Sequence, residues 1–247
     1  MSRAIVTVAT GAHYIRGQER LTEWCAANGE DYVNWRDRLP PGSPDHSHVP
    51  YAFKAFALQN AVEQGFTTLL WADSCIIPVK PLLQLWKRIE REGYWIGYGG
   101  WTNYEWTADS AYADLFPDPW NITWSLARTV NREIPHVVAT SFGLSVKHPT
   151  GRAILDEYLR LAKTRAFCGP WINSNHAQHN ATPNDRLPRV GPCGPADVRG
   201  HRHDQTALSV IAWKQACKLT SSPEVFAYGK LGDEIDSRTI LLADGLY

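Results

Sequence analysis

Short apolar runs alternate with amphipathic segments along this chain, and the alternation predicts strands separated by helices. Apolar runs predict buried strands at 3–9, 67–78 and 137–146, and shorter strands at 31–35, 94–98 and 223–228. Apolar positions at helical spacing predict helices at 16–27, 50–64, 79–92, 149–164 and 206–218, with a short helix within 120–130. A strand, a helix and a second strand at the start predict a nucleotide-binding half-fold, so the fold class is α/β, a Rossmann-like mixed sheet flanked by helices.

Several details of these elements follow from single residues. Pro50 suits the first turn of its helix, and Gly143 predicts either one strand or a pair of strands broken at that glycine. Leu83 and Trp213 fall on stripes expected to face the core. Residues 36–48 and 167–200 are rich in Pro, Gly and polar residues, which predicts loops.

The stretch 67–78 carries a carboxylate between two apolar segments. Leu69, Leu70 and Trp71 precede Asp73, and Ile76 and Ile77 follow it before Pro78. This pattern predicts a buried strand that places Asp73 at the edge of the sheet where ligands bind. The alternative is a turn in which Asp73 caps the next helix.

Composition narrows the function without naming it. The 247 residues are 44% hydrophobic and 20% charged, with zero formal net charge. We expect a single domain over 1–247, with a nucleotide-binding half at 1–100 and an acceptor-binding half at 101–247. Zero net charge argues against a dedicated nucleic-acid binder, although Arg186, Arg189, Arg199 and Arg202 form a local basic stretch. Eleven Trp suit stacking on sugar rings and equally suit core packing.

The five cysteines are widely spaced and odd in number, which favours reduced thiols over disulfides or a zinc site. The first residues lack the long apolar run of a signal peptide, and no later run is long enough to span a membrane. These features predict a cytoplasmic protein without a membrane partner.

Side chains that could do chemistry occur in three further places. Lys54 is either a solvated helix residue or a cation that reaches a phosphate or Asp73. Trp101, Tyr104 and Trp106 follow a strand in a glycine-marked loop, where aromatic rings could stack on an acceptor or form a small hydrophobic cluster of their own.

The third place is His203-Asp204-Gln205 at the start of a helix. Asp204 is a helix N-cap in one interpretation and a general base or a ligand of a substrate hydroxyl in the other. His203 beside it is a possible metal ligand or proton-transfer group.

In order along the chain, the segments PYAFKAFAL, LLWADSCIIPVKPL, SFGLSVKHPTGRAILDEYLRLA and HRHDQTALSVIA resemble nucleotide-sugar-dependent glycosyltransferases of the GT-A fold. The similarity is to a branch with a lysine-bearing helix, a WxDS strand end and a late HDQ helix. It covers roughly residues 3–165 and 200–220.

The resemblance implies a role for each matching position. Thr10, Gly11 and Tyr14 would hold the nucleotide, and Asp37 would contact its base or ribose. Lys54, Asp73 and Ser74 would lie at the donor, with Asp73 as the first acid of a DxD metal motif. Asp204 would face the acceptor and serve as base in inverting members, with His203 beside it. Gln205 would join the three aromatic residues of 101–106 in binding substrate.

The sequence departs from the DxD motif at Cys75, which is a poor ligand for Mg²⁺ or Mn²⁺. The leaving diphosphate still requires neutralisation. Asp73 and His203 could hold a divalent cation, Mn²⁺ or Mg²⁺, or cationic side chains such as Lys54 and Arg202 could act without a metal.

Together these features predict transfer of a sugar from a nucleotide-sugar, with UDP as the expected nucleotide, to a hydroxyl of a glycan or small molecule. Three alternatives remain: a carbohydrate-binding protein without catalysis, a transferase acting on hydroxymethylated bases in DNA, and a nucleotidyltransferase. The last would need a glycine-rich phosphate loop that residues 10–13 do not supply.

Overall fold

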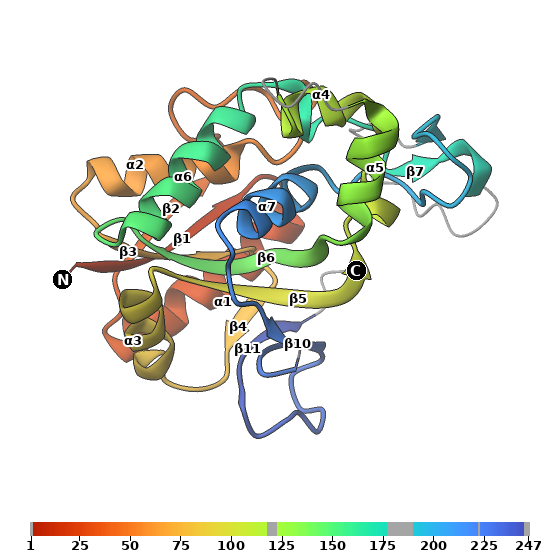
Figure 1. The fold of residues 1–247 in the computed structure, drawn as a ribbon. Coiled ribbons are helices and arrows are strands. Elements are labelled where there is room, and N and C mark those ends of the chain that lie inside the picture. Colours follow the sequence, from red (N-terminus) through yellow and green to blue (C-terminus); the bar gives the residue numbers. More distant parts are fainter. Residues whose placement is uncertain (1, 118–122, 177–189, 222, 245–247) are drawn as a thin grey trace.

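The central feature of the fold is a six-stranded mixed sheet (Figure 1). The structure is a computed structural model that describes residues 2–117, 123–176, 190–221 and 223–244. The strand order is β2-β1-β3-β6-β5-β9. These strands are β1 (Arg3–Ala9), β2 (Tyr32–Arg36), β3 (Thr68–Ala72), β5 (Tyr94–Thr102), β6 (Pro135–Ser145) and β9 (Thr220–Ser221). β1 pairs in parallel with both β2 and β3, whereas β6 is antiparallel to β3 and β5.

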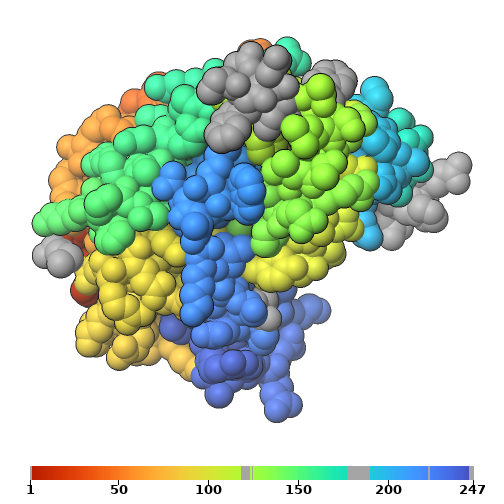
Figure 2. Space-filling view, viewed as in Figure 1, coloured from red at the N-terminus to blue at the C-terminus, as the bar shows by residue number. Residues whose placement is uncertain are grey.

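Helices cover both faces of this sheet. On one face lie α2 (Phe53–Glu63), α6 (Pro149–Leu161) and α7 (His203–Lys214); on the other lie α1 (Ala12–Asn28) and α3 (Leu83–Glu92). Two separate hydrophobic clusters fill the two interfaces. The shorter helices α4 (Tyr112–Leu115) and α5 (Trp124–Arg132) follow β5, and Figure 2 shows the surface of α7 between those of α5 and α6. The predicted mixed sheet flanked by helices is therefore confirmed.

A second, three-stranded sheet lies below the first in Figure 1. It contains β4 (Ile76–Pro78), β10 (Val225–Gly229) and β11 (Thr239–Asp244), in the order β10-β11-β4. A small ribbon joins β7 (Ile172–Asn173) to β8 (Val190–Gly191). Single 3-10 turns lie at Tyr104–Trp106, Asp109–Ala111, Arg165–Phe167 and Ser174–His176. None of the described helices has both the length and the apolar character needed to cross a bilayer.

Several predicted boundaries were wrong. The stretch 67–78 is two strands in two different sheets, because the chain turns at Asp73 and β4 pairs with β11. Pro50 lies in a turn ahead of α2, which begins only at Phe53. β6 is a single strand through Gly143. Leu83 and Trp213 are exposed, because each lies on the outward side of its helix. β9 and β11 were missed, and part of the predicted 120–130 helix lies outside the described residues.

Strand direction determines where a site can form. Because β1, β2 and β3 are parallel, their carboxyl ends meet at one edge of the sheet. β6 runs back beside β3 and brings residues 139–141 to that same edge, where it pairs Ser141 with Ala72.

Candidate functional site

Asp73 lies directly after the carboxyl end of β3, in a turn held by backbone hydrogen bonds. Its amide donates to Thr140 O (2.9 Å), and its carbonyl accepts from the amide of Ile76 (2.9 Å). The Trp71 indole N–H donates to Asp73 Oδ1 (2.8 Å). The side chain remains 32% exposed, so Asp73 is both fixed in orientation and open to a ligand. It does not cap α3, which starts at Leu83 without a side-chain cap.

Lys54 connects Asp73 to a carboxylate 131 positions further along the chain. Its Nζ lies 3.1 Å from Asp73 Oδ1, 3.1 Å from Asp204 Oδ2 and 2.9 Å from the Ala139 carbonyl oxygen. The side chain is only 3% exposed. Burial alone would lower the pKa of Lys54, but the two carboxylates outweigh burial and raise it, so the ammonium stays charged. We call Asp73, Lys54 and Asp204 the Lys54 triad.

Asp204 is the buried member of the Lys54 triad. It lies in the first turn of α7, and its Oδ2 also accepts a hydrogen bond from the Tyr158 hydroxyl (3.2 Å). Burial raises the pKa of Asp204 to about 6, against a lowering by Lys54 and with a further raising by Asp73. The N-cap interpretation was wrong: Arg202 occupies the cap position, and no side chain caps α7. The carboxylate is instead buried against Lys54 and Tyr158, with its pKa raised toward neutral pH.

The predicted nucleotide residues meet at the ends of β1 and β2. The Gly11 amide donates to Asp37 Oδ1 (3.1 Å), and the Asp37 amide donates to Ala9 O (2.9 Å). Gly11 has a φ of 90°, which suits glycine. α1 starts at the next residue, and no side chain caps it. Thr10 is half-buried between these groups.

The first turn of α1 lies near Tyr51, which borders the Lys54 triad. Tyr14 in that turn is 45% exposed. Burial and the Asp204 carboxylate raise the pKa of Tyr51, with a smaller contribution from Tyr14. The Tyr51 ring in turn lies 5.3 Å from Lys54 Nζ. The end of β1 and the triad are therefore neighbouring parts of one edge of the sheet.

Aromatic rings and one guanidinium form a continuous stack next to α7. Exposed Trp101 meets Trp106 edge to face at 6.0 Å. Arg202 lies between the rings of Trp106 (4.0 Å) and Trp171 (3.8 Å), and Trp171 stacks on His203 at 5.5 Å. Of the three aromatic residues predicted to bind substrate, Trp101 thus has the most exposed ring and Trp106 is partly covered by Arg202.

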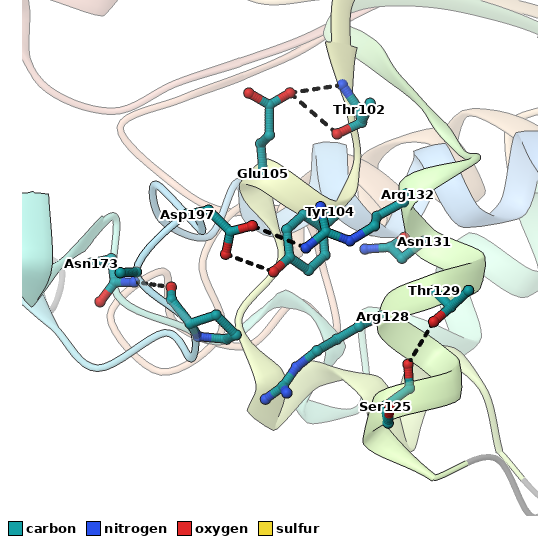
Figure 3. Close-up of polar contacts among 12 residues, drawn as sticks. Thr102, Tyr104, Glu105, Ser125, Arg128, Thr129, Asn131, Arg132, Asn173 and Asp197 are labelled. Atoms are coloured by element: carbon teal, nitrogen blue, oxygen red, sulfur yellow. Dashed lines mark hydrogen bonds and ion pairs between the residues drawn. The ribbon is translucent and has the colours of Figure 1, made fainter.

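Tyr104 contributes to a structural clamp (Figure 3). Its hydroxyl donates to Asp197 Oδ1 (2.7 Å), and the guanidinium of Arg132 lies 3.6 Å from the centre of its ring while pairing with Asp197 Oδ2 (2.9 Å). The ring is 2% exposed. In this arrangement Tyr104 holds the segment around Asp197 against α5, and its faces are not open to an acceptor.

His203 is enclosed by other side chains. Its Nδ1 lies 2.9 Å from Phe167 O and must donate to that carbonyl, while Nε2 is buried without a protein partner among the described residues. Burial lowers the pKa of His203 well below its ordinary value, so the ring is neutral. Ser74 is also buried, and Gln205 is half-buried.

The donor set does not fit a divalent metal well. The described residues contain no group of three or more His, Cys, Asp or Glu placed to hold one. Burial raises the pKa of Cys75 to about 12, which keeps it a thiol. The Lys54 ammonium already lies between the two carboxylates. The expected Mn²⁺ or Mg²⁺ remains a prediction, for which Asp73 is the half-exposed ligand.

Sequence reasoning missed several supporting groups. Tyr158 was read only as a core position, although a hydroxyl on an apolar helix face is a signal for a buried polar partner. Trp71 and Ala139 were likewise read only as strand residues. Within the basic stretch, Arg199 lies 3.4 Å from Glu105 and Arg202 stacks as above, while Arg186 and Arg189 lie outside the described residues.

Comparisons with known proteins give distant structural similarity only. No family model matches this sequence, and no curated protein matches it significantly. Among solved structures, one similar protein is a glycosyltransferase involved in the glycosylation of the major capsid of PBCV-1. It shares 12% identity over 68% of this chain and 70% of that chain, with a TM-score of 0.42. Another is mouse xyloside xylosyltransferase 1, at 7% identity over 98% and 97% of the two chains, with a TM-score of 0.46. Both scores are below 0.5, so neither similarity assigns a function here.

Proposed function

We propose that this protein transfers a glycosyl group from a nucleotide-sugar, with UDP as the expected nucleotide, to a hydroxyl of a glycan or small molecule. The observation that carries the proposal is the Lys54 triad. In it the half-exposed Asp73 and the buried Asp204, whose pKa is about 6, contact the same lysine ammonium. All three side chains lie at the edge where β1, β2 and β3 end. This edge is where open α/β sheets bind ligands.

The donor would lie between the ends of β1 and β2 and the Lys54 triad. Asp37 and Gly11 would face the ribose or base, and the uncapped amides at the start of α1 would face the diphosphate. Asp73 would orient the donor through its exposed carboxylate. Binding both reactants at one edge supplies the proximity that the reaction needs.

In the transfer step, the acceptor oxygen forms a bond to the anomeric carbon while the bond from that carbon to the diphosphate breaks. The acceptor proton passes to Asp204, and the nucleoside diphosphate leaves with the bonding electron pair. A single displacement inverts the anomeric centre. Tyr158 and Lys54 contact Asp204 and would orient it, and the exposed Trp101 would stack on an acceptor sugar.

The test is turnover of nucleotide-sugars. Purified protein is incubated with UDP-, GDP- and other nucleotide-sugars, and release of nucleoside diphosphate and the anomeric configuration of the product are measured. Asp204→Asn should lower kcat/KM at least about 100-fold, because it removes the proton acceptor. Tyr158→Phe keeps the carboxylate and is the matched control, expected to lose far less activity.

One result would reject the proposed transfer, and another would reject the role given to Asp204. Sugar binding without turnover of any donor would favour the non-catalytic carbohydrate-binding alternative. Full activity in Asp204→Asn would remove Asp204 from the reaction.

A further inference from the structure

The expected metal motif is incomplete in this chain, while a lysine lies where the two acids converge. We propose that the Lys54 ammonium takes the place of a divalent cation between Asp73 and Asp204, so that this centre holds no metal ion. It follows that sugar transfer at this centre needs no metal ion, and this second part of the inference rests on the proposed function.

The coordination of Lys54 supports this proposal. An ammonium group has three N–H donors and no acceptor. Three oxygens lie within 3.1 Å of Nζ, one each from Asp73, Asp204 and Ala139. Each donor therefore has one acceptor. The rings of Tyr51 and Trp71 lie 5.3 and 5.4 Å away and enclose the cation further.

The positions expected to complete a metal shell do not come together as one. Cys75 is a buried thiol, and its carbonyl accepts from the Asp244 amide (3.0 Å). His203 Nδ1 donates to Phe167 O, and although its Nε2 has no protein partner, the described residues hold no group of three His, Cys, Asp or Glu side chains placed to bind a metal. Asp73 Oδ1 already accepts from both Trp71 and Lys54. The lysine and its neighbours already use Asp73 Oδ1 and Asp204 Oδ2, so the two acids offer a hard cation at most their second oxygens, short of the oxygen-rich octahedral shell that it prefers.

Charge distinguishes this centre from a metal site. With both carboxylates ionised, the Lys54 triad carries one net negative charge, whereas a divalent cation in place of the ammonium would make the two carboxylates and the cation neutral overall. The triad alone therefore does not attract the donor diphosphate. That role would fall to the amide groups at the start of α1, which point a positive partial charge at this edge.

The experiment measures Mn²⁺ binding directly and needs no sugar. Loss of the free Mn²⁺ electron paramagnetic resonance signal is titrated for the wild-type protein, Asp73→Asn, Lys54→Met and Lys54→Met/Asp73→Asn. We expect no saturable site in the wild type up to millimolar Mn²⁺. Lys54→Met keeps the side-chain length and removes the charge, so it should gain one site at least about tenfold tighter than any in the wild type. The double variant should lose that site.

A second arm uses UDP, whose phosphates could complete a shell around Asp73. UDP affinity is measured by calorimetry in EDTA and in Mn²⁺, and we expect the two values to agree within about threefold. If UDP does not bind at all, the proposed function fails while the Mn²⁺ titration still decides the present proposal.

Three results would overturn the proposal: stoichiometric Mn²⁺ binding to the wild type that Asp73→Asn abolishes, a large Asp73-dependent gain in UDP affinity with Mn²⁺, or a folded Lys54→Met variant that gains no Mn²⁺ site. If Lys54→Met does not fold, the wild-type and Asp73→Asn titrations still test the proposal. No saturable Mn²⁺ site in the wild type supports it, and a stoichiometric site that Asp73→Asn abolishes overturns it.

Discussion

At the scale of single residues, the environment of Asp204 sets the chemistry that this site can do. A carboxyl group in water has lost its proton well below neutral pH and is a weak base. Burial in α7 raises the pKa of Asp204 to about 6, and the lysine keeps the rise from going further. In the proposed reaction, a carboxylate with this pKa would have a base strength matched to neutral pH, a general requirement for proton transfer in catalysis.

The raised pKa predicts an acid limb in the activity. Asp204 must be ionised to accept a proton, so kcat/KM should fall about tenfold per pH unit as the pH drops below about 6. The measurement is donor turnover between about pH 4.5 and 8. Residual activity of Asp204→Asn should lack this limb, and an unchanged limb in that variant would assign it to another group.

The sequence predicted the members of the Lys54 triad better than it predicted their surroundings. Asp73 and Asp204 were expected in one site, and Lys54 was expected near the donor or Asp73. The burial of His203 and the use of Tyr104 as a clamp could not be predicted, because both depend on neighbours supplied by the long 165–200 segment. Periodicity gives the face of an element but not the partner on that face.

At the scale of elements, close packing between helices and the sheet explains two glycines inside regular elements. A Cβ on Gly143 would lie 2.3 Å from Ile89 Cδ1, so α3 packs directly on β6 at the residue that suggested a strand break. A Cβ on Gly151 would meet the carbonyl oxygens of Ser145 and Gly93, at 2.2 and 2.3 Å. These glycines allow α3 and α6 to approach the sheet, and neither one ends an element.

Gly151→Ala should destabilise the protein although it lies in a helix. Alanine normally stabilises a helix relative to glycine by about 1 kcal/mol, but here the methyl group would overlap two backbone oxygens that cannot rotate away. We expect a net loss of about 2 kcal/mol in the free energy of unfolding, measured in urea. Arg152→Ala, at the next and more exposed position, is the control and should change stability little. An increase in stability for Gly151→Ala would contradict the packing described for α6.

At the scale of the whole molecule, three buried histidines make folding sensitive to acid. Burial lowers the pKa of His136 to about 3 and of His201 to about 4, and that of His203 well below its ordinary value. Each is neutral in the folded state, while in the unfolded chain each takes up a proton below about pH 6.5. Asp204 acts in the opposite direction, because the folded state binds its proton near pH 6.

Stability should therefore fall as the pH is lowered. For each histidine the folded pKa is depressed, so its contribution is present above about pH 6.5 and is lost progressively toward its folded pKa, at about 1.4 kcal/mol per pH unit. After the offset from Asp204, we expect a loss of roughly 4 kcal/mol between about pH 7 and 5 in urea unfolding. His136→Gln should flatten this dependence, whereas exposed His13→Gln should not. A flat profile in the wild type would show that the histidines protonate without unfolding.

The second sheet has a consequence for how the chain can be assembled. β4 follows the Asp73 turn at once, and its ladder partner in the described chain is β11, more than 160 positions later. A nascent polypeptide that has not yet released residues 239–244 from the ribosome therefore cannot pair β4. Until those residues are made, the turn that positions the half-exposed carboxylate has only its contacts with β3, β6 and Lys54.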